Sequence, residues 1–164
     1  MEIPEIHVLN KVHWQFFGTL TFKKEKMLER DRLNMWFALL RQTGRQFHTP
    51  FHHLLWVLRQ EQGEQFGRTH FHYLLAGLDR HVENPTTCFW LMSRWEQLNG
   101  GYSRVHEFDP RLGAGSYLVK EGGAFNDHTL GGDHYESAKF SSPDCELMIA
   151  NSVWKVARRT SERR

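Results

Sequence analysis

A histidine-x-histidine pair within a short apolar run is the feature of this sequence that most restricts its fold. His70 and His72 lie in the stretch 68–75, which is otherwise rich in aromatic and aliphatic residues. Because successive side chains of a β-strand point to opposite faces, the two imidazoles would project from one face, about 7 Å apart. That spacing is compatible with one metal ion between them, and a strand with two solvated histidines is the alternative.

A carboxylate is expected beside the two histidines. The apolar run 54–58 turns polar and reaches Glu61, and glycines interrupt the chain before His70. This order predicts a strand, a hairpin loop and a second strand, which would fold Glu61 back beside His70 and His72. Two imidazoles and one carboxylate, with positions left for water or phosphate oxygen, suit one Mg²⁺ or Mn²⁺ ion, and zinc is also compatible with these ligands.

The remaining chain reads as a mixture of strands and helices. Period-two patterns predict strands over 13–22 and 102–108, whereas apolar stripes of period 3.6 predict helices over 23–47, 85–98 and 111–121. Gly44 is expected to end the first helix, and Asn84 to cap the second. Asp109 with the following proline is expected to open the third, with Leu112 facing the sheet.

The C-terminal part, 124–164, is expected to be a loop followed by a basic helix. The glycine-rich stretch 126–134 is interpreted as a surface loop, with a metal site as the alternative, and Tyr135 as a loop residue. The helix is expected to begin near Ser142 and to place Cys145, Ile149, Val153 and Val156 on one packed face. The basic end of this helix is expected to be solvated, or else to bind phosphate.

Length and composition indicate one domain in a cytoplasmic protein. The chain has 164 residues, so residues 1–164 are expected to form a single domain, with the motifs in about 13–123. Cys88 and Cys145 lie in helix-like patterns and are interpreted as reduced core residues. No apolar run is long enough to span a membrane, and no export signal is recognisable. The net charge of +2 does not by itself indicate a nucleic-acid partner.

The third expected helix carries a second candidate site. Tyr117 and Lys120 are three residues apart and would share one flank. A phenol with a pKa near 10 is a poor nucleophile at neutral pH unless its phenolate is stabilised, and an ammonium can do this. A surface pair without chemistry is the alternative.

Three motifs taken together resemble the HUH endonuclease superfamily, specifically its single-tyrosine rolling-circle replication initiators (Rep). The motifs are 17–22, then His70 and His72 around Phe71, then Tyr117 to Lys120, and the similarity covers about 13–123. The segment 61–64 also resembles the part of related viral initiators that supplies a carboxylate ligand. Glu61 is favoured over Glu64, because Glu64 falls in the expected hairpin loop.

The resemblance implies an α+β fold with a central antiparallel sheet flanked by helices, ferredoxin-like or RRM-like, and with the site on the sheet. It implies metal-dependent nicking and joining of single-stranded DNA or an origin hairpin through a 5′-phosphotyrosine on Tyr117. Glu61, His70 and His72 would hold the ion, and Lys120 would offset negative charge. A host or fused helicase is an expected partner, because the chain has no Gly-rich phosphate loop. A bacterial plasmid or phage is the expected context, or the host nucleus for a eukaryotic virus.

DNA contacts are expected from positive and hydroxyl side chains near the site. The candidates are Thr19, Thr21, Arg59, Arg68, Arg104 and Arg111, of which the two threonines would alternatively support the histidines. His52 and His53 are interpreted as turn residues, and His106 as a surface histidine or a further neighbour of the site.

Two rival functions remain, namely a transposase of the same superfamily and a non-catalytic single-stranded nucleic-acid-binding domain.

Overall fold

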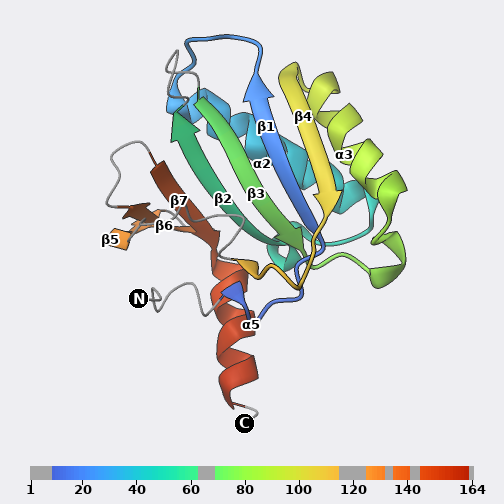
Figure 1. Ribbon diagram of the computed structural model, residues 1–164, viewed down its shortest axis with the longest axis vertical. Helices are drawn as coiled ribbons and strands as arrows, with labels where there is room; N and C mark the ends of the chain where they lie inside the picture. Colours follow the sequence, from blue (N-terminus) through green and yellow to red (C-terminus); the bar gives the residue numbers. More distant parts are fainter. Residues whose placement is uncertain (1–8, 63–68, 115–124, 132–134, 141–144, 163–164) are drawn as a thin grey trace.

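One antiparallel sheet of seven strands forms the centre of the protein (Figure 1). The computed structural model describes residues 9–62, 69–114, 125–131, 135–140 and 145–162. The strands are β1 (Phe16–Phe22), β2 (Leu55–Gln62), β3 (Thr69–Ala76), β4 (Gly100–Glu107), β5 (Phe125–Gly131), β6 (Tyr135–Phe140) and β7 (Cys145–Ala150). The helices are α2 (Glu29–Gln46), α3 (Pro85–Gln97) and α5 (Asn151–Glu162), with short 3₁₀ turns at Phe51–His53 and Arg80–Val82.

The first four strands and two helices make a ferredoxin-like unit. Along the chain they follow the order β1, α2, β2, β3, α3, β4, and across the sheet the order β4-β1-β3-β2. Strands β7, β6 and β5 extend the same sheet beyond β2. The expected α+β class with an antiparallel sheet flanked by helices is therefore confirmed.

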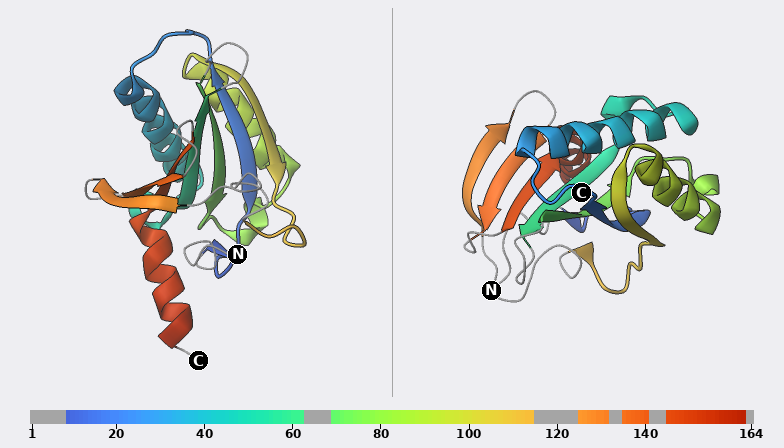
Figure 2. Two further views of the ribbon diagram at one scale, coloured as in Figure 1. Left: turned by 60° about the vertical axis from the view of Figure 1, so that its left-hand side comes forward. Right: turned by 90° about the horizontal axis from the view of Figure 1, so that it is seen from above.

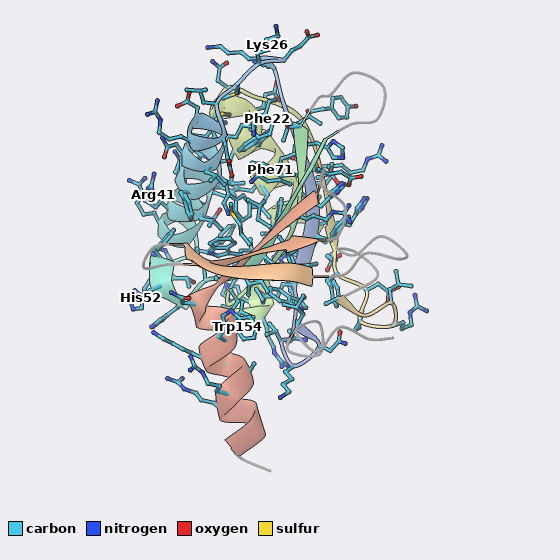
Figure 3. All side chains as sticks on the ribbon, turned by 90° about the vertical axis from the view of Figure 1, so that its left-hand side faces the viewer. Phe22, Lys26, Arg41, His52, Phe71 and Trp154 are labelled. Atoms are coloured by element: carbon cyan, nitrogen blue, oxygen red, sulfur yellow. The ribbon has the colours of Figure 1, made fainter. Side chains whose placement is uncertain are left out.

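Helices α2 and α3 cover the same face of the sheet (Figure 2). Trp36 of α2 packs on Tyr73 and Trp56, with ring centroids 4.9 and 5.8 Å away. On the same face Phe22 meets Phe71 edge-on at 4.9 Å (Figure 3). Because the side chains of a strand alternate, burying these aromatic rings sends the neighbouring residues of β1, β2 and β3 to the opposite face.

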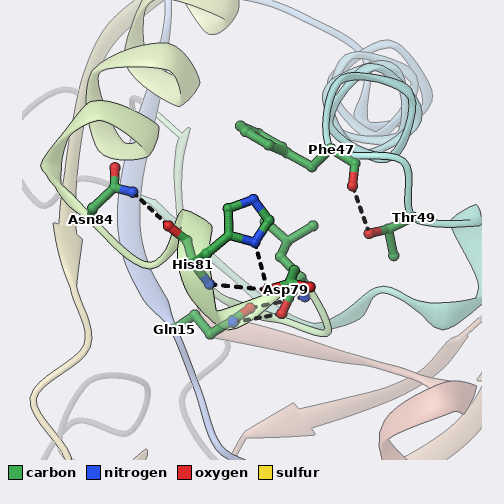
Figure 4. Close-up of polar contacts among 7 residues, drawn as sticks. Gln15, Phe47, Thr49, Asp79, His81 and Asn84 are labelled. Carbon is green, nitrogen blue, oxygen red and sulfur yellow. Dashed lines mark hydrogen bonds and ion pairs between the residues drawn. The ribbon is translucent and has the colours of Figure 1, made fainter.

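Side-chain hydrogen bonds hold the ends of these elements (Figure 4). The buried Gln15 amide donates to the Leu78 carbonyl at 2.8 Å and accepts from the Leu78 amide at 3.0 Å, which ties the start of β1 to the end of β3. Asn84 accepts from the Thr87 amide at 3.1 Å, so it caps α3 as expected, with Pro85 in the first turn.

Helix α2 begins later than expected, and Gly44 has another role than the expected one. It begins at Glu29 and continues to Gln46, so Gly44 lies inside the helix and does not end it. A Cβ at Gly44 would lie 2.6 Å from the Thr49 carbonyl oxygen. The glycine is therefore needed for the close return of the chain, where the Thr49 amide donates to the Gly44 carbonyl at 2.8 Å.

The helix expected from Arg111 does not begin there. Asp109 accepts a hydrogen bond from the Arg111 amide at 3.0 Å, which closes a turn, and Gly113 then adopts a left-handed φ of +71°. Leu112 is 54% exposed, so the expectation that it faces the sheet is wrong. Of residues 109–114, only Ala114 has a helical conformation.

The C-terminal part contains strands where a loop and the start of a helix were expected, and the expected basic helix begins only at Asn151. Most of the stretch 126–134 belongs to β5, Tyr135 begins β6, and residues 145–150 form β7. Four consecutive residues, 147–150, are buried to 2% exposure or less. Such a run is typical of a strand covered on both faces, and the i, i+4 spacing of Cys145, Ile149 and Val153 matched a helix by coincidence.

Two further expectations concern the cysteines and the membrane. Cys88 lies in α3 as a buried free thiol, as expected, whereas Cys145 lies in a strand. Within the described residues, every helix is too short or too polar to span a membrane.

Gly18→Ala should destabilise the protein, although alanine is normally the better strand residue. A Cβ at position 18 would lie 2.2 Å from a ring carbon of Tyr73, whose side chain is fully buried. We expect a loss of about 1–3 kcal/mol in the free energy of unfolding, measured by urea denaturation, because the ring has to shift in a packed core. In a Tyr73→Leu background the same substitution should cost clearly less, and equal costs in both backgrounds would contradict the proposed clash.

Candidate metal centre

The pairing of β2 with β3 brings Glu61 and the two histidines together. Glu61 lies opposite His70, and Arg59 lies opposite His72. On the other side of β3, Thr19 of β1 is the register partner of His72. These side chains share the face opposite α2 and α3, since their neighbours Phe71 and Tyr73 point into the helix-covered core.

The three candidate ligands are close enough to bind one ion. Their ligand atoms all lie within 4.8 Å of one another. One carboxylate oxygen, Oε2 of Glu61, lies 3.3 Å from Nε2 of His72 and 3.7 Å from Nε2 of His70. Ligands about 2.1 Å from a common ion and at right angles to each other are about 3 Å apart, so small side-chain movements would complete the coordination. Glu61, His70 and His72 therefore form a group that could hold a metal ion.

His72 is oriented and kept neutral by its surroundings. Its Nδ1 lies 3.1 Å from the Thr19 hydroxyl, so with Nδ1 protonated as the donor Nε2 is free to bind an ion. The Phe17 ring lies nearly parallel to the imidazole, with ring centroids 6.1 Å apart. Burial, followed by electrostatic interactions with Arg59 and His70, lowers the pKa of His72 to about 4, and Glu61 only partly opposes this shift. The imidazole is thus uncharged near pH 7, which is the form that binds metal ions.

The centre is reachable from one side. The side chains of His70 and His72 are 26% and 17% exposed, whereas that of Glu61 is 9% exposed. The carboxylate is thus the inner ligand and the imidazoles lie nearer to solvent. Such a site leaves coordination positions for water or a substrate oxygen, as in metal sites that perform catalysis.

Arg59 lies inside the site rather than on the surface. Its guanidinium donates to Oε2 of Glu61 at 2.8 Å, and its side chain is 7% exposed. Arg59 was expected to contact DNA, and its pairing with Glu61 was not predicted. The signal was present, because residues 59 and 61 are two apart on a strand and must share a face.

The other candidate residues lie at varying distances from the centre. The Thr21 hydroxyl donates to the Tyr102 carbonyl at 2.8 Å, so Thr21 joins β1 to β4 and does not support a histidine. Arg104 and His106 are exposed on β4, opposite Thr19 and Phe17. Arg111 is exposed and forms a two-point ion pair with Asp109.

Several sequence candidates fall on residues that the structure does not describe. These are Glu64, Arg68, Tyr117 and Lys120. His52 and His53 are described, and they lie in the 3₁₀ turn before β2, as expected.

His72→Ala or His70→Ala should abolish tight binding of Mn²⁺. Removing a ligand should weaken binding by about 100-fold or more, because even residues that only orient a ligand contribute 10- to 100-fold. Isothermal titration calorimetry of folded, metal-free protein measures this directly. His106→Ala is the matched control, since this exposed histidine lies on the same face, two strands from β3, and should leave the affinity unchanged. Equal losses in the control would contradict the site.

Thr19→Val should weaken Mn²⁺ binding by about tenfold, because the isosteric valine cannot accept the hydrogen bond from His72. Thr21→Val is the control on the same strand and face, because the Thr21 hydroxyl donates to the Tyr102 carbonyl. The same titration should place Thr21→Val close to the wild type. If both variants bind Mn²⁺ as the wild type does, Thr19 does not position His72.

Comparison with known proteins does not assign the chain to a family. No protein-family model, curated protein or solved structure matches it. The centre is a two-histidine, one-carboxylate group on the face of a ferredoxin-like sheet opposite α2 and α3.

Proposed function

We propose that this protein is a metal-dependent endonuclease that nicks and joins single-stranded DNA, and that it initiates rolling-circle replication. The observation that supports this most directly is the convergence of Glu61, His70 and His72 within 4.8 Å on the face of the sheet opposite α2 and α3. In the sequence these ligands stand between the strand motif 17–22 and the Tyr117 motif, in the order that resembles HUH initiators.

The ligand set favours Mg²⁺ or Mn²⁺ as the ion. One buried carboxylate oxygen and two imidazoles leave several positions for water and phosphate oxygen, which hard divalent ions prefer. When bound, such an ion would draw negative charge from a non-bridging oxygen of the scissile phosphate. Thr19 and Phe17 would keep His72 in the orientation that the ion requires.

Tyr117 is the proposed nucleophile. Its phenolate oxygen would form a bond to the scissile phosphorus while the bond from phosphorus to the 3′ oxygen breaks, and that oxygen would take up a proton. The products are a 5′-phosphotyrosyl protein and a free 3′-hydroxyl. Because one phosphodiester bond replaces another, the same step run in reverse rejoins the strand. Lys120 would offset negative charge on the phenolate or on the phosphate.

The two tyrosines whose side chains the structure describes are poor alternatives. Tyr73 is fully buried on the helix-covered face, and burial raises the pKa of its phenol, which disfavours the phenolate. Tyr102 is 78% exposed on β4, and it is separated from β3 by β1. Tyr102 is therefore a suitable control for the nucleophile test.

Tyr117→Phe should abolish the covalent protein–DNA adduct while leaving binding of DNA and Mn²⁺ largely intact. The assay incubates the protein with a randomised single-stranded DNA library and Mn²⁺, and then detects protein–DNA bands that resist denaturation. Tyr102→Phe should form the adduct at the wild-type level, and EDTA should prevent it in both proteins. Sequencing of the attached strand would separate a replication origin from a transposon end.

Two results would contradict the proposal. An adduct that persists in Tyr117→Phe would exclude Tyr117 as the nucleophile. Binding of single-stranded DNA without Mn²⁺ and without any adduct from the wild type would favour a non-catalytic binding domain.

A further inference from the structure

Arg59 places a permanent positive charge beside the metal centre. Its Nη2 lies 2.8 Å from Oε2 of Glu61, and the same oxygen is the one nearest to His72 and His70, at 3.3 and 3.7 Å. Both charged side chains are buried, with exposures of 7% for Arg59 and 9% for Glu61. A single carboxylate oxygen is therefore shared between a fixed cation and the position that a metal ion would take.

This arrangement changes the charge that an incoming ion meets. Arg59 and Glu61 together carry no net charge, and imidazoles that bind metals are neutral. The buried carboxylate is thus compensated before any ion arrives, so the metal-free protein carries no uncompensated buried charge there. A divalent ion would then approach a guanidinium at a distance of a few ångströms, in surroundings where charges are weakly screened.

We infer that Arg59 acts as a resident counter-ion of Glu61, which keeps metal binding weak until a phosphate group joins the site. With the divalent ion bound, the ion, Arg59 and Glu61 carry a summed charge of +2, which attracts an anion strongly. A phosphodiester supplies one negative charge and reduces the repulsion between Arg59 and the ion. The ion and the DNA strand therefore bind cooperatively, each raising the affinity for the other by the same factor. This role of Arg59 rests on the proposed metal centre, but it does not depend on Tyr117 or on strand cleavage.

The sign of one affinity change tests the inference. Metal-free wild type, Arg59→Met, Arg59→Lys and Arg104→Met are titrated with Mn²⁺ in the absence of DNA. Arg59→Met should bind Mn²⁺ at least about tenfold more tightly than the wild type, because a neutral side chain of similar length removes the repulsion between Arg59 and the ion. Arg59→Lys retains a positive side chain beside Glu61 and should stay closer to the wild type than Arg59→Met does. Arg104→Met removes an exposed charge two strands from β3 in the same row and should change nothing.

The opposite sign overturns the inference. If Arg59→Met binds Mn²⁺ as the wild type does or more weakly, Arg59 serves only to hold Glu61 in place. No Mn²⁺ binding by wild type or any variant overturns both this inference and the metal centre. Tighter binding in Arg59→Met, without an adduct from the wild type, supports the inference and counts only against the nicking proposal.

Loss of the buried ion pair could unfold the Arg59→Met variant, so a second measurement covers this case. Mn²⁺ should then restore the folded circular dichroism spectrum, because the ion replaces the missing positive charge beside Glu61. In a folded variant, saturating Mn²⁺ should raise the melting temperature more than it does in the wild type. A variant that stays unfolded in Mn²⁺, or gains less than the wild type, overturns the inference.

A final set of titrations measures the coupling between Mn²⁺ binding and binding of a phosphodiester. In a Tyr117→Phe background, which prevents covalent capture, Mn²⁺ titrations are repeated with a thymidine oligonucleotide. The oligonucleotide should increase the Mn²⁺ affinity about tenfold, and by clearly less when Arg59→Met is added. Equal increases with and without Arg59 would overturn the proposed coupling.

Discussion

The antiparallel register between β2 and β3 is the constraint on which the candidate site depends. It sets Glu61 opposite His70 and Arg59 opposite His72, so four polar side chains meet on one face. Since the side-chain period of a strand is two, a shift of one residue would send either the histidines or the carboxylate into the helix-covered core. The buried rings of Phe71 and Tyr73 oppose such a shift, because they would have to leave that core. Packing of these rings on one face of the sheet thereby fixes which side chains meet at the candidate site on the other face.

Strand β1 likewise packs against the core with one face and contacts the candidate site with the other. Gly18, within the strand motif 17–22, lies over the Tyr73 ring, and Gly100 similarly makes room for the Trp95 indole. Trp95 in turn donates to the Thr21 carbonyl at 2.9 Å, near the point where the pairing of β1 with β4 shifts register. These contacts hold β1 beside β3, and β1 supplies the Thr19 hydroxyl that meets His72. The motif thus combines a packing role on one face with an orienting role on the other.

Much of the ferredoxin-like unit was predictable from the sequence, because its patterns are local and regular. The period-two run of β1, the hairpin of β2 and β3, and the Asn84 cap all follow from neighbouring residues, and the convergence of Glu61 with His70 and His72 follows from the hairpin. The C-terminal strands were not recognised, since residues 147–150 are apolar without alternation and matched a helical spacing equally well. The pairing of β7 with β2 is a long-range contact that no local pattern specifies. The role of Arg59 was missed for another reason: positive charge was associated with surface contact, and burial cannot be read from residue type.

Every ligand of the candidate centre comes from one hairpin, between positions 61 and 72. Gln62, the end of β2, and Thr69, the start of β3, are only seven positions apart in the sequence, so little chain entropy is lost in assembling the ligands. The three candidate ligands all belong to β2 and β3, so their assembly does not require β4 or β7 to be in place. The centre is therefore a low-contact-order feature, whereas the pairings of β1 with β3, of β1 with β4 and of β2 with β7 join distant segments. A metal ion bound there would favour the pairing of β2 with β3.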